Sequence, residues 1–183
     1  MNQSFNSNTA QPPVSNAPSP ADQTARMIAQ LNQQAQNSAK NFYWIAGLSF
    51  VNSLITAFGA EFYLVVGLAS TLIVDYLAVG MAQEAPELAM VFKVAALVIS
   101  LIASGIFALF GFLAGRGKRW AYFVGMALYG VDALIMLALH EWKGFIFHLF
   151  FLWVLFTGLR ALNQLKKFES VKQTDFPQNI GAS

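Results

Sequence analysis

Apolar residues dominate the chain from residue 42 to residue 162, and short polar stretches divide them into five segments. These segments cover residues 42–59, 62–81, 90–114, 120–139 and 144–162. A helix rises 1.5 Å per residue, so about 20 apolar residues cross a bilayer core of about 30 Å. The pattern therefore predicts an all-α fold, a polytopic transmembrane bundle of five spans joined by short antiparallel connections.

The first segment, 42–59, is the least clearly a span. Ser49, Asn52, Ser53 and Thr56 fall at helical spacing and form a polar stripe on an otherwise apolar helix. This stripe could pack against the bundle or face the lipid headgroups. The alternative to five spans is therefore four spans plus an interfacial first helix.

The two ends of the chain are polar. Residues 1–20 are rich in Asn, Ser, Gln and Pro, so we expect a disordered polar tail. Residues 21–41 contain good helix formers with a thin apolar stripe, which indicates a weak surface helix or linker. Residues 163–183 are expected to form a basic cytoplasmic helix and tail, since Leu165 and Phe168 share one face suited to anionic headgroups.

The composition agrees with a bilayer as solvent. Mean hydropathy is +0.51 and 11% of the residues are charged, against about 25% in soluble proteins. The chain contains no cysteine, which excludes disulfides, thiolate metal sites and a cysteine nucleophile. Basic residues stand at the ends of apolar runs and form no basic face, so we expect the lipid bilayer as partner and no nucleic acid. A homo-oligomer or another membrane protein is a further possible partner.

The distribution of Lys and Arg predicts the orientation, because cytoplasmic segments carry the excess. With five spans, one side holds Arg26, Lys40, Lys93 and Lys143, and the other holds Arg116, Lys118, Arg119, Arg160, Lys166, Lys167 and Lys172. The C-terminus is then cytoplasmic and the N-terminus lies outside. The four-span alternative moves Arg26 and Lys40 to the cytoplasmic side and gives the better charge distribution. The length of segment 42–59 and its short connection to the next segment favour five spans.

Four ionisable residues inside the spans are the candidate site: Asp75, Asp132, His148 and Lys93. Such residues are costly in a bilayer and are functional candidates by default. Counted along alternating helices, all four lie about 5 to 10 Å from the non-cytoplasmic end. If the two carboxylates are close together, one should remain protonated, as in a proton relay. If Lys93 or His148 lies between them, the cluster is neutral and holds helices together.

The sequence predicts no metal, no cofactor and no catalytic residue. His140 and His148 are eight residues apart, and no H-x-x-x-H or E-x-x-H pattern occurs. G-x-S-x-G is absent, and no Gly-rich loop precedes a helix as a phosphate site requires.

Small residues in segment 90–114 are expected to pack helices closely together. Ala96, Ser100 and Ser104 recur at every fourth position, and Gly111 with Gly115 forms a G-x-x-x-G pattern.

The stretches "RWAYFVGMALYGVDALIMLA", "FIFHLFFLWVLFTGLRAL" and "NFYWIAGLSFVNSLI" resemble a group of small, uncharacterised bacterial multi-pass membrane proteins. The resemblance covers roughly residues 41–165 and transfers no site. It implies an integral protein of the bacterial plasma membrane. The favoured role is a non-catalytic membrane subunit or scaffold with a buried polar cluster. A small proton- or cation-coupled transporter or channel is the alternative, and an intramembrane enzyme comes third.

Overall fold

The computed structural model describes residues 19–59 and 67–175, and this part of the chain is all-helical, as predicted. The elements are α1 (Pro20–Ala57), α2 (Ala69–Glu84), a 3₁₀ turn η1 (Pro86–Leu88), α3 (Ala89–Gly115), α4 (Arg119–Ala138) and α5 (Trp142–Asp175). The tail predicted to be disordered lies outside the described residues, apart from its last two positions.

The predicted surface helix and the predicted first span form one helix, α1, of 38 residues. Ser19 begins it with a capping box, in which its hydroxyl accepts from the Asp22 amide and Asp22 accepts from the Ser19 amide. At 1.5 Å per residue this helix is about 57 Å long. A helix of this length can pack against all the other long helices.

The polar stripe of α1 packs against the bundle. Ser49, Asn52 and Ser53 are at most 5% exposed. They continue a heptad spacing that starts in the polar half of the helix with Ala35, Ser38, Phe42 and Ile45, all of them buried. This 3–4 repeat keeps one face of α1 turned toward its neighbours. The polar stripe could either pack against the bundle or face the lipid headgroups, and in the structure it packs against the bundle.

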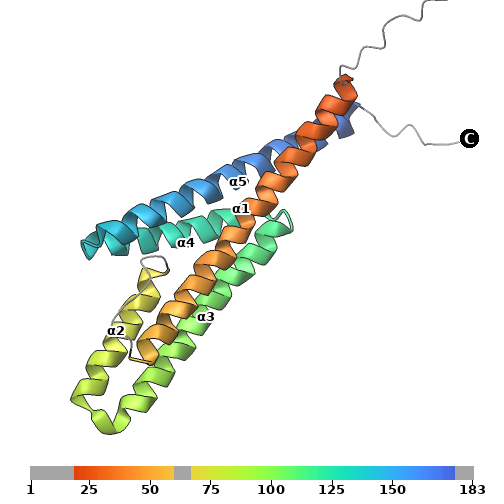
Figure 1. The fold of residues 1–183 in the computed structure, drawn as a ribbon. Helices are drawn as coiled ribbons and strands as arrows, with labels where there is room; N and C mark the ends of the chain where they lie inside the picture. The colour runs from red at the N-terminus through yellow and green to blue at the C-terminus, as the bar shows by residue number, and fades with distance from the viewer. Residues whose placement is uncertain (1–18, 60–66, 176–183) are drawn as a thin grey trace, which may run out of the picture.

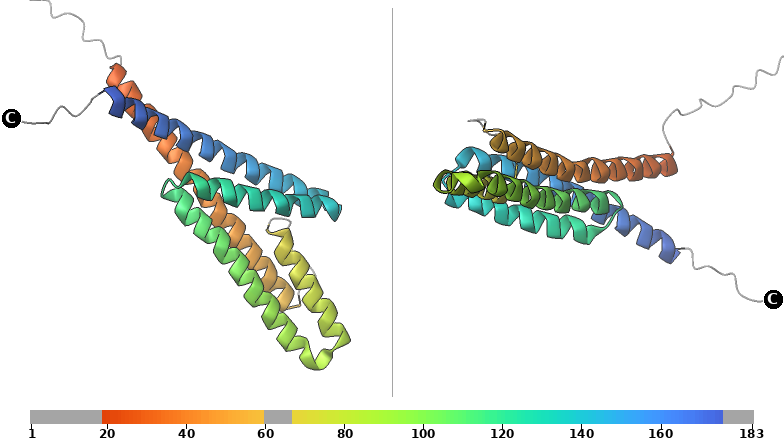
Figure 2. Two further views of the ribbon diagram at one scale, coloured as in Figure 1. Left: turned by 180° about the vertical axis from the view of Figure 1, so that it is seen from behind. Right: turned by 90° about the horizontal axis from the view of Figure 1, so that it is seen from below.

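Helices α2, α3 and α5 all pack along helix α1 (Figure 1). Helix α3 runs antiparallel along its C-terminal part, and the C-terminal part of α5 packs against its N-terminal part. The α4–α5 pair diverges from the α1–α3 pair, and α2 begins between the two pairs. Figure 2 shows the same arrangement from behind and from below. The start of α1 and the end of α5 consequently lie at the same end of the molecule.

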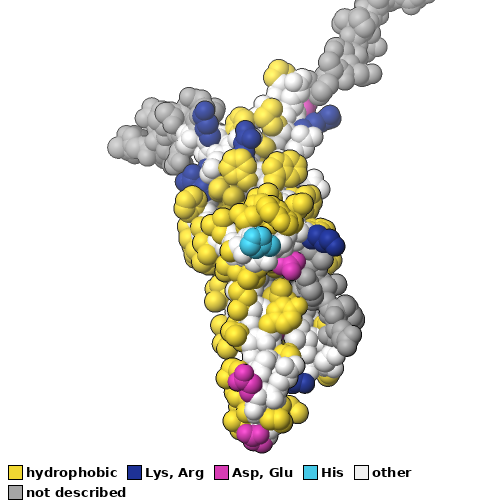
Figure 3. All heavy atoms as spheres, turned by 90° about the vertical axis from the view of Figure 1, so that its left-hand side faces the viewer, with side chains coloured by type: hydrophobic (Ala, Val, Ile, Leu, Met, Phe, Trp, Pro, Cys, Tyr) yellow, Lys and Arg dark blue, Asp and Glu magenta, His cyan; other side chains and the backbone are white. Residues whose placement is uncertain are grey.

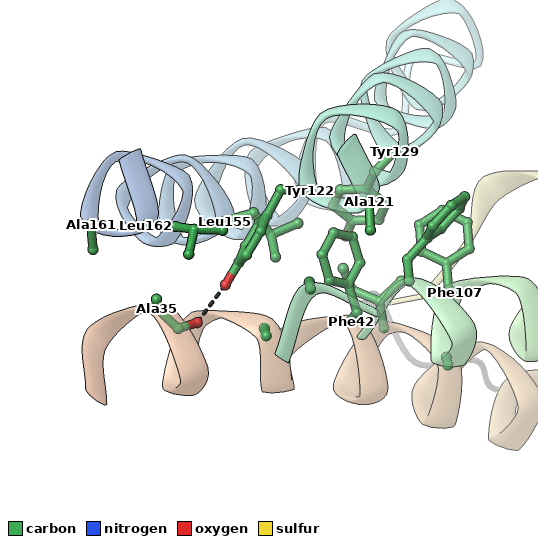
Figure 4. Packing of buried hydrophobic residues seen from close by; sticks show 14 of the residues in the cluster. Ala35, Phe42, Phe107, Ala121, Tyr122, Tyr129, Leu155, Ala161 and Leu162 are labelled. Carbon is green, nitrogen blue, oxygen red and sulfur yellow. Dashed lines mark hydrogen bonds between the residues drawn. The ribbon is translucent and has the colours of Figure 1, made fainter. Parts of the chain in front are cut away.

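An aromatic cluster fills the junction of α1, α3, α4 and α5 (Figure 4). The Phe42 ring lies 5.9 to 6.4 Å from the rings of Phe107, Phe110 and Tyr122, in tilted packing. Gly125 makes room for it, because a Cβ there would stand 2.6 Å from the Phe42 ring. The Tyr122 hydroxyl donates to the carbonyl of Ala35, which ties α4 to the polar half of α1.

Three helical segments in the described part of the chain are long and apolar enough to cross a membrane: Pro86–Gly115, Arg119–Ala138 and Trp142–Ser170. Apolar side chains such as Val98, Ile102 and Phe123 are exposed on them, as lipid-facing residues would be. Five spans are not confirmed. Helix α2 has 16 residues, about 24 Å, and is shorter than a bilayer core.

The predicted hairpin between the first two spans is absent. Ser49 contacts Leu68 and Ser53 contacts Asp75, so the residue numbers rise together and the two helices are parallel. Helix α2 starts beside the middle of α1 rather than at its end (Figure 1). Side chains of other helices accept hydrogen bonds from the first N–H groups of α2 inside the bundle. These N–H groups therefore do not depend on water for a hydrogen-bond partner.

Charged residues are distributed unevenly along the molecule. Figure 3 shows most Lys and Arg around the upper end and acidic side chains at the lower end, with further basic side chains in the middle and near the lower end. The upper set comes from both ends of the helical region and from the α3–α4 turn: Arg26, Lys40, Arg116, Lys118, Arg119, Arg160, Lys166 and Lys167. Glu84 and Glu87 stand at the α2–α3 connection. Most basic residues in the described part therefore gather at the end that holds the start of α1 and the end of α5, and Lys93 and Lys143 lie elsewhere.

Candidate functional site

The buried beginning of α2 is the centre of the candidate site. The Leu68 amide donates to Ser49 Oγ at 2.7 Å. The amides of Ala69 and Ser70 donate to the two carboxylate oxygens of Asp132 at 2.6 and 2.9 Å. Leu68 stands at the N-cap position and has no side chain that could accept these bonds. Asp132, from α4, therefore does what an N-cap residue normally does, and its negative charge faces the positive end of the α2 dipole.

His148, from α5, completes this contact. Its Nε2 lies 2.9 Å from Asp132 Oδ2, and its Nδ1 lies 2.8 Å from the Gly144 carbonyl oxygen. The imidazole is 0% exposed and Asp132 is 4% exposed. A carbonyl only accepts, so Nδ1 must donate, and the proton between Nε2 and the carboxylate is shared by the pair.

Aromatic rings fix the position of the imidazole. The Tyr129 ring stacks on His148 with centroids 4.4 Å apart and planes 16° apart. Phe107 and Phe151 pack edge-on against Tyr129 at 6.0 and 6.4 Å. Tyr129 and Asp132 are three residues apart on α4, so both reach the same face of the helix. The pair is thus held by two spans and by the start of α2.

Asp75 forms a second polar site, between α1, α2 and α3. Ser53 Oγ donates to its Oδ2 at 2.7 Å, and Ser100 Oγ lies 3.5 Å from its Oδ1. Asp75 is 3% exposed. A cavity of about 10 Å³ adjoins it, lined also by Thr56 and Lys93. That volume is about what one water molecule needs.

The structure divides the four predicted site residues into two groups. His148 lies on Asp132, whereas Lys93 shares a cavity with Asp75. The Lys93 amine and the Asp75 carboxylate, both in the described part, are not within the 4.0 Å of an ion pair. Asp75 follows Ala69 by six residues. Along the axis of α2, Asp75 therefore lies about 9 Å from the Ala69 amide that Asp132 binds. The two carboxylates therefore have separate partners.

Several residues of the site escaped sequence reasoning. The main partners of Asp132 are the backbone amides of Ala69 and Ser70, which no residue type reveals. Ser53 was visible only as part of the polar stripe of α1. The bond between His148 Nδ1 and the Gly144 carbonyl links residues four apart on one helix. Their spacing was only a weak indication of a functional site, because many buried polar side chains bond to the preceding turn of their own helix.

The predicted packing residues lie on the inner face of α3 or at its end. Ala96, Ser100 and Ser104 are at most 5% exposed. A Cβ on Gly111 would stand 3.1 Å from Phe42 and Tyr43, and one on Gly115 would stand 4.0 Å from Ala39. These contacts give the antiparallel register of α1 and α3.

Across residues 19–59 and 67–175, no three His, Asp or Glu side chains come together as a metal site would need.

No protein-family model, no curated protein and no solved structure matches this chain.

Proposed function

We propose that the chain is an integral membrane protein without catalytic activity, a subunit or scaffold whose buried polar contacts fix the start of α2. One observation supports this most. Asp132 already makes three hydrogen bonds within its own chain: it accepts two from backbone amides and shares one with His148. A carboxylate so satisfied has little capacity left for a substrate, and its partners come from helices that it holds together.

The partner of such a subunit would be another membrane protein or a second copy of this chain. Exposed apolar side chains cover much of α3, α4 and α5, and lipid or a partner helix can cover them equally well. The resemblance to small bacterial multi-pass proteins supports the plasma membrane as its location.

The orientation follows from the segregated charges. The basic end carries the excess of Lys and Arg that cytoplasmic segments carry. We therefore place the start of α1 and the end of α5 in the cytoplasm. This matches the four-span alternative for the side of the N-terminus. In this proposal α1 crosses together with the three long apolar helices, and α2 is the element that does not cross.

A second candidate function, a small proton- or cation-coupled transporter, is favoured by Asp75. Its carboxylate has one close donor, Ser53, and it adjoins a water-sized cavity with Lys93 on the wall. Helices that start inside a bundle also occur at the ion sites of transporters. A monomer of this size has few helices with which to enclose a pathway, so transport would require an oligomer.

Flux measurements separate the two functions. The protein is reconstituted in liposomes with a pH-sensitive dye inside, and a proton gradient and then a sodium gradient are applied. A scaffold gives the same flux as protein-free liposomes. The transporter would be established instead by a flux that Asp75→Asn abolishes. Glu87→Gln, at the exposed α2–α3 connection, is the control and should leave that flux unchanged.

A further inference from the structure

Helix α1 carries a second stripe of residues at heptad spacing, besides the buried one that packs into the bundle. The stripe begins with four carboxamides: Gln30, Gln34, Asn37 and Asn41. It continues toward the end of the helix with four apolar residues: Trp44, Leu48, Val51 and Ile55. All eight are exposed or half-buried. Steps of four and three residues alternate along its whole length, which is the pattern by which one helix packs along another.

The carboxamide half of this stripe lines a groove of about 430 Å³ between α1 and α5. Val154 and Thr157 form the α5 side of the groove. The Ser38 hydroxyl donates to the Val154 carbonyl, and Val154 stands near the middle of the apolar segment Trp142–Ser170. The carboxamides therefore lie beside a membrane-spanning part of α5, where lipid chains offer them no hydrogen bond. A polar protein surface satisfies them better.

Hydrogen bonds within α1 determine which groups Asn37 and Asn41 offer to such a surface. Lys40 Nζ donates to Asn37 Oδ1 at 3.2 Å. Asn41 Nδ2 donates to the backbone carbonyls of Asn37 and Ser38 at 3.2 and 3.1 Å. Asn37 therefore offers N–H donors and Asn41 offers a carbonyl acceptor, four residues apart on the same stripe. The stripe is thus complementary to a second copy of itself.

We propose that this stripe is the contact between two copies of the chain, whose α1 helices pack in parallel about a two-fold axis. In a parallel pair each residue of the stripe meets its equivalent or the next one along. Asn37 Nδ2 of each copy then donates to Asn41 Oδ1 of the other, and the apolar half packs below. The stripe contains no charged residue, so pairing equal positions brings no like charges together within it. This inference rests on the proposed membrane subunit with α1 as a span, and it identifies the partner as a second copy.

Disulfide cross-linking of the full chain in membranes tests the contact, because the chain has no cysteine of its own. Asn37→Cys and Leu48→Cys are introduced singly on the stripe, and a mild oxidant is added. A disulfide needs Cβ atoms about 3.5 to 4.5 Å apart, so we expect cross-linked dimers from both variants. Gln36→Cys and Gly47→Cys are the matched controls. Each is exposed and adjacent in sequence but about 100° away around the helix, and should remain monomeric.

The proposal is overturned if either stripe cysteine fails to cross-link, or if its control cross-links to the same extent. The result is also distinguishable from that of the flux measurement. A chain without flux and without cross-links remains a scaffold, but its partner is not a second copy. A proton flux together with stripe-specific cross-links overturns the scaffold and supports the dimer.

Energy transfer between labelled copies measures the strength of the contact without relying on a cysteine in the stripe. Copies labelled at Glu87→Cys with a donor or an acceptor dye are mixed in liposomes and diluted with lipid. Asn37→Ala should raise the dissociation constant about 3- to 30-fold, because hydrogen bonds between the helices are lost. Asn32→Ala, exposed on the same helix but outside the stripe, should leave it unchanged. No energy transfer in the wild-type stripe, or equal effects of the two substitutions, overturns the proposal.

Discussion

At the scale of single residues, Asp132 connects three helices through hydrogen bonds. Its carboxylate joins α4 to the first turn of α2 and, through His148, to α5. A buried charge of this kind is tolerated because every partner has the correct sign and hydrogen-bonding role. Removing the charge therefore affects three helices at once.

Asp132→Asn should lower the free energy of unfolding in detergent by about 2 to 4 kcal/mol. The asparagine amide keeps one acceptor oxygen, but its N–H groups face the donors at Ala69 or Ser70, and His148 loses its carboxylate partner. Denaturant or thermal unfolding followed by circular dichroism measures the change. Glu87→Gln, an exposed carboxylate replaced in the same way, should stay within about 0.5 kcal/mol. Equal effects of the two substitutions would contradict the role of Asp132.

Tyr122→Phe isolates one hydrogen bond of the core. The variant keeps the ring that packs on Phe42 and loses the bond to the Ala35 carbonyl. We expect a loss of about 1 kcal/mol in unfolding free energy. Tyr76→Phe is the control, since Tyr76 is 56% exposed on α2. A loss as large for Tyr76 would show that the hydroxyl of Tyr122 has no special role.

The sequence predicted the ionisable members of the site but not their grouping. The depth of Asp75, Asp132, His148 and Lys93 followed from counting residues along helices. Their grouping depends on how far α2 is displaced along α1, and that displacement comes from amides at Ala69 and Ser70. A pattern of side chains carries no information about which backbone groups lack an intrahelical partner.

At the scale of elements, glycine positions on α4 separate an inner face from an outer one. Gly125 lies against Phe42, whereas Gly130 has open space around its Cα. Both stand in the middle of the same helix. The two positions therefore form a matched pair for substitution.

Gly125→Ala should destabilise the fold by about 1 to 3 kcal/mol, because the new methyl group overlaps the Phe42 ring. Gly130→Ala should be neutral or stabilising by up to about 1 kcal/mol, because alanine favours helix. Parallel unfolding curves of the two variants measure the difference. A Gly130→Ala variant less stable than Gly125→Ala would mean that the inner face of α4 is assigned wrongly.

Apolar runs predicted two of the helices closely. Segments 90–114 and 120–139 lie within one residue of Ala89–Gly115 and Arg119–Ala138 at both ends. Helix α1 was less predictable as one continuous helix. Its first part, residues 20–34, is mostly exposed, and burial begins at Ala35 and Ser38, where the Ser38 hydroxyl donates to the Val154 carbonyl of α5. A hydropathy pattern predicts well which helices face lipid, but it predicts poorly which polar segments are buried against other helices.

At the scale of the whole molecule, the two ends differ in charge, and this difference predicts accessibility in cells. The chain has no cysteine, so single cysteines can be introduced without background. Glu87→Cys should react with an impermeant maleimide added to intact cells. Arg26→Cys, near the start of α1, and Lys118→Cys, in the α3–α4 turn, should react only after permeabilisation, because both belong to the basic end.

Labelling of Arg26→Cys in intact cells, with Lys118→Cys protected, would restore the five-span arrangement with the N-terminus outside. Labelling of both would reverse the orientation of the whole bundle. The three single-cysteine variants are therefore sufficient to distinguish these topologies.

The buried start of α2 also has a consequence for biosynthesis. The residue that binds its first amides follows Ala69 by 63 positions in the chain. At about 5 to 20 residues per second, the ribosome needs about 3 to 13 s to reach it. During that interval the start of α2 has no carboxylate partner, so the helix completes its docking only after α4 has entered the membrane. Assembly of this protein is therefore not a simple succession of hairpins, and truncation before α4 should leave α2 accessible to proteases.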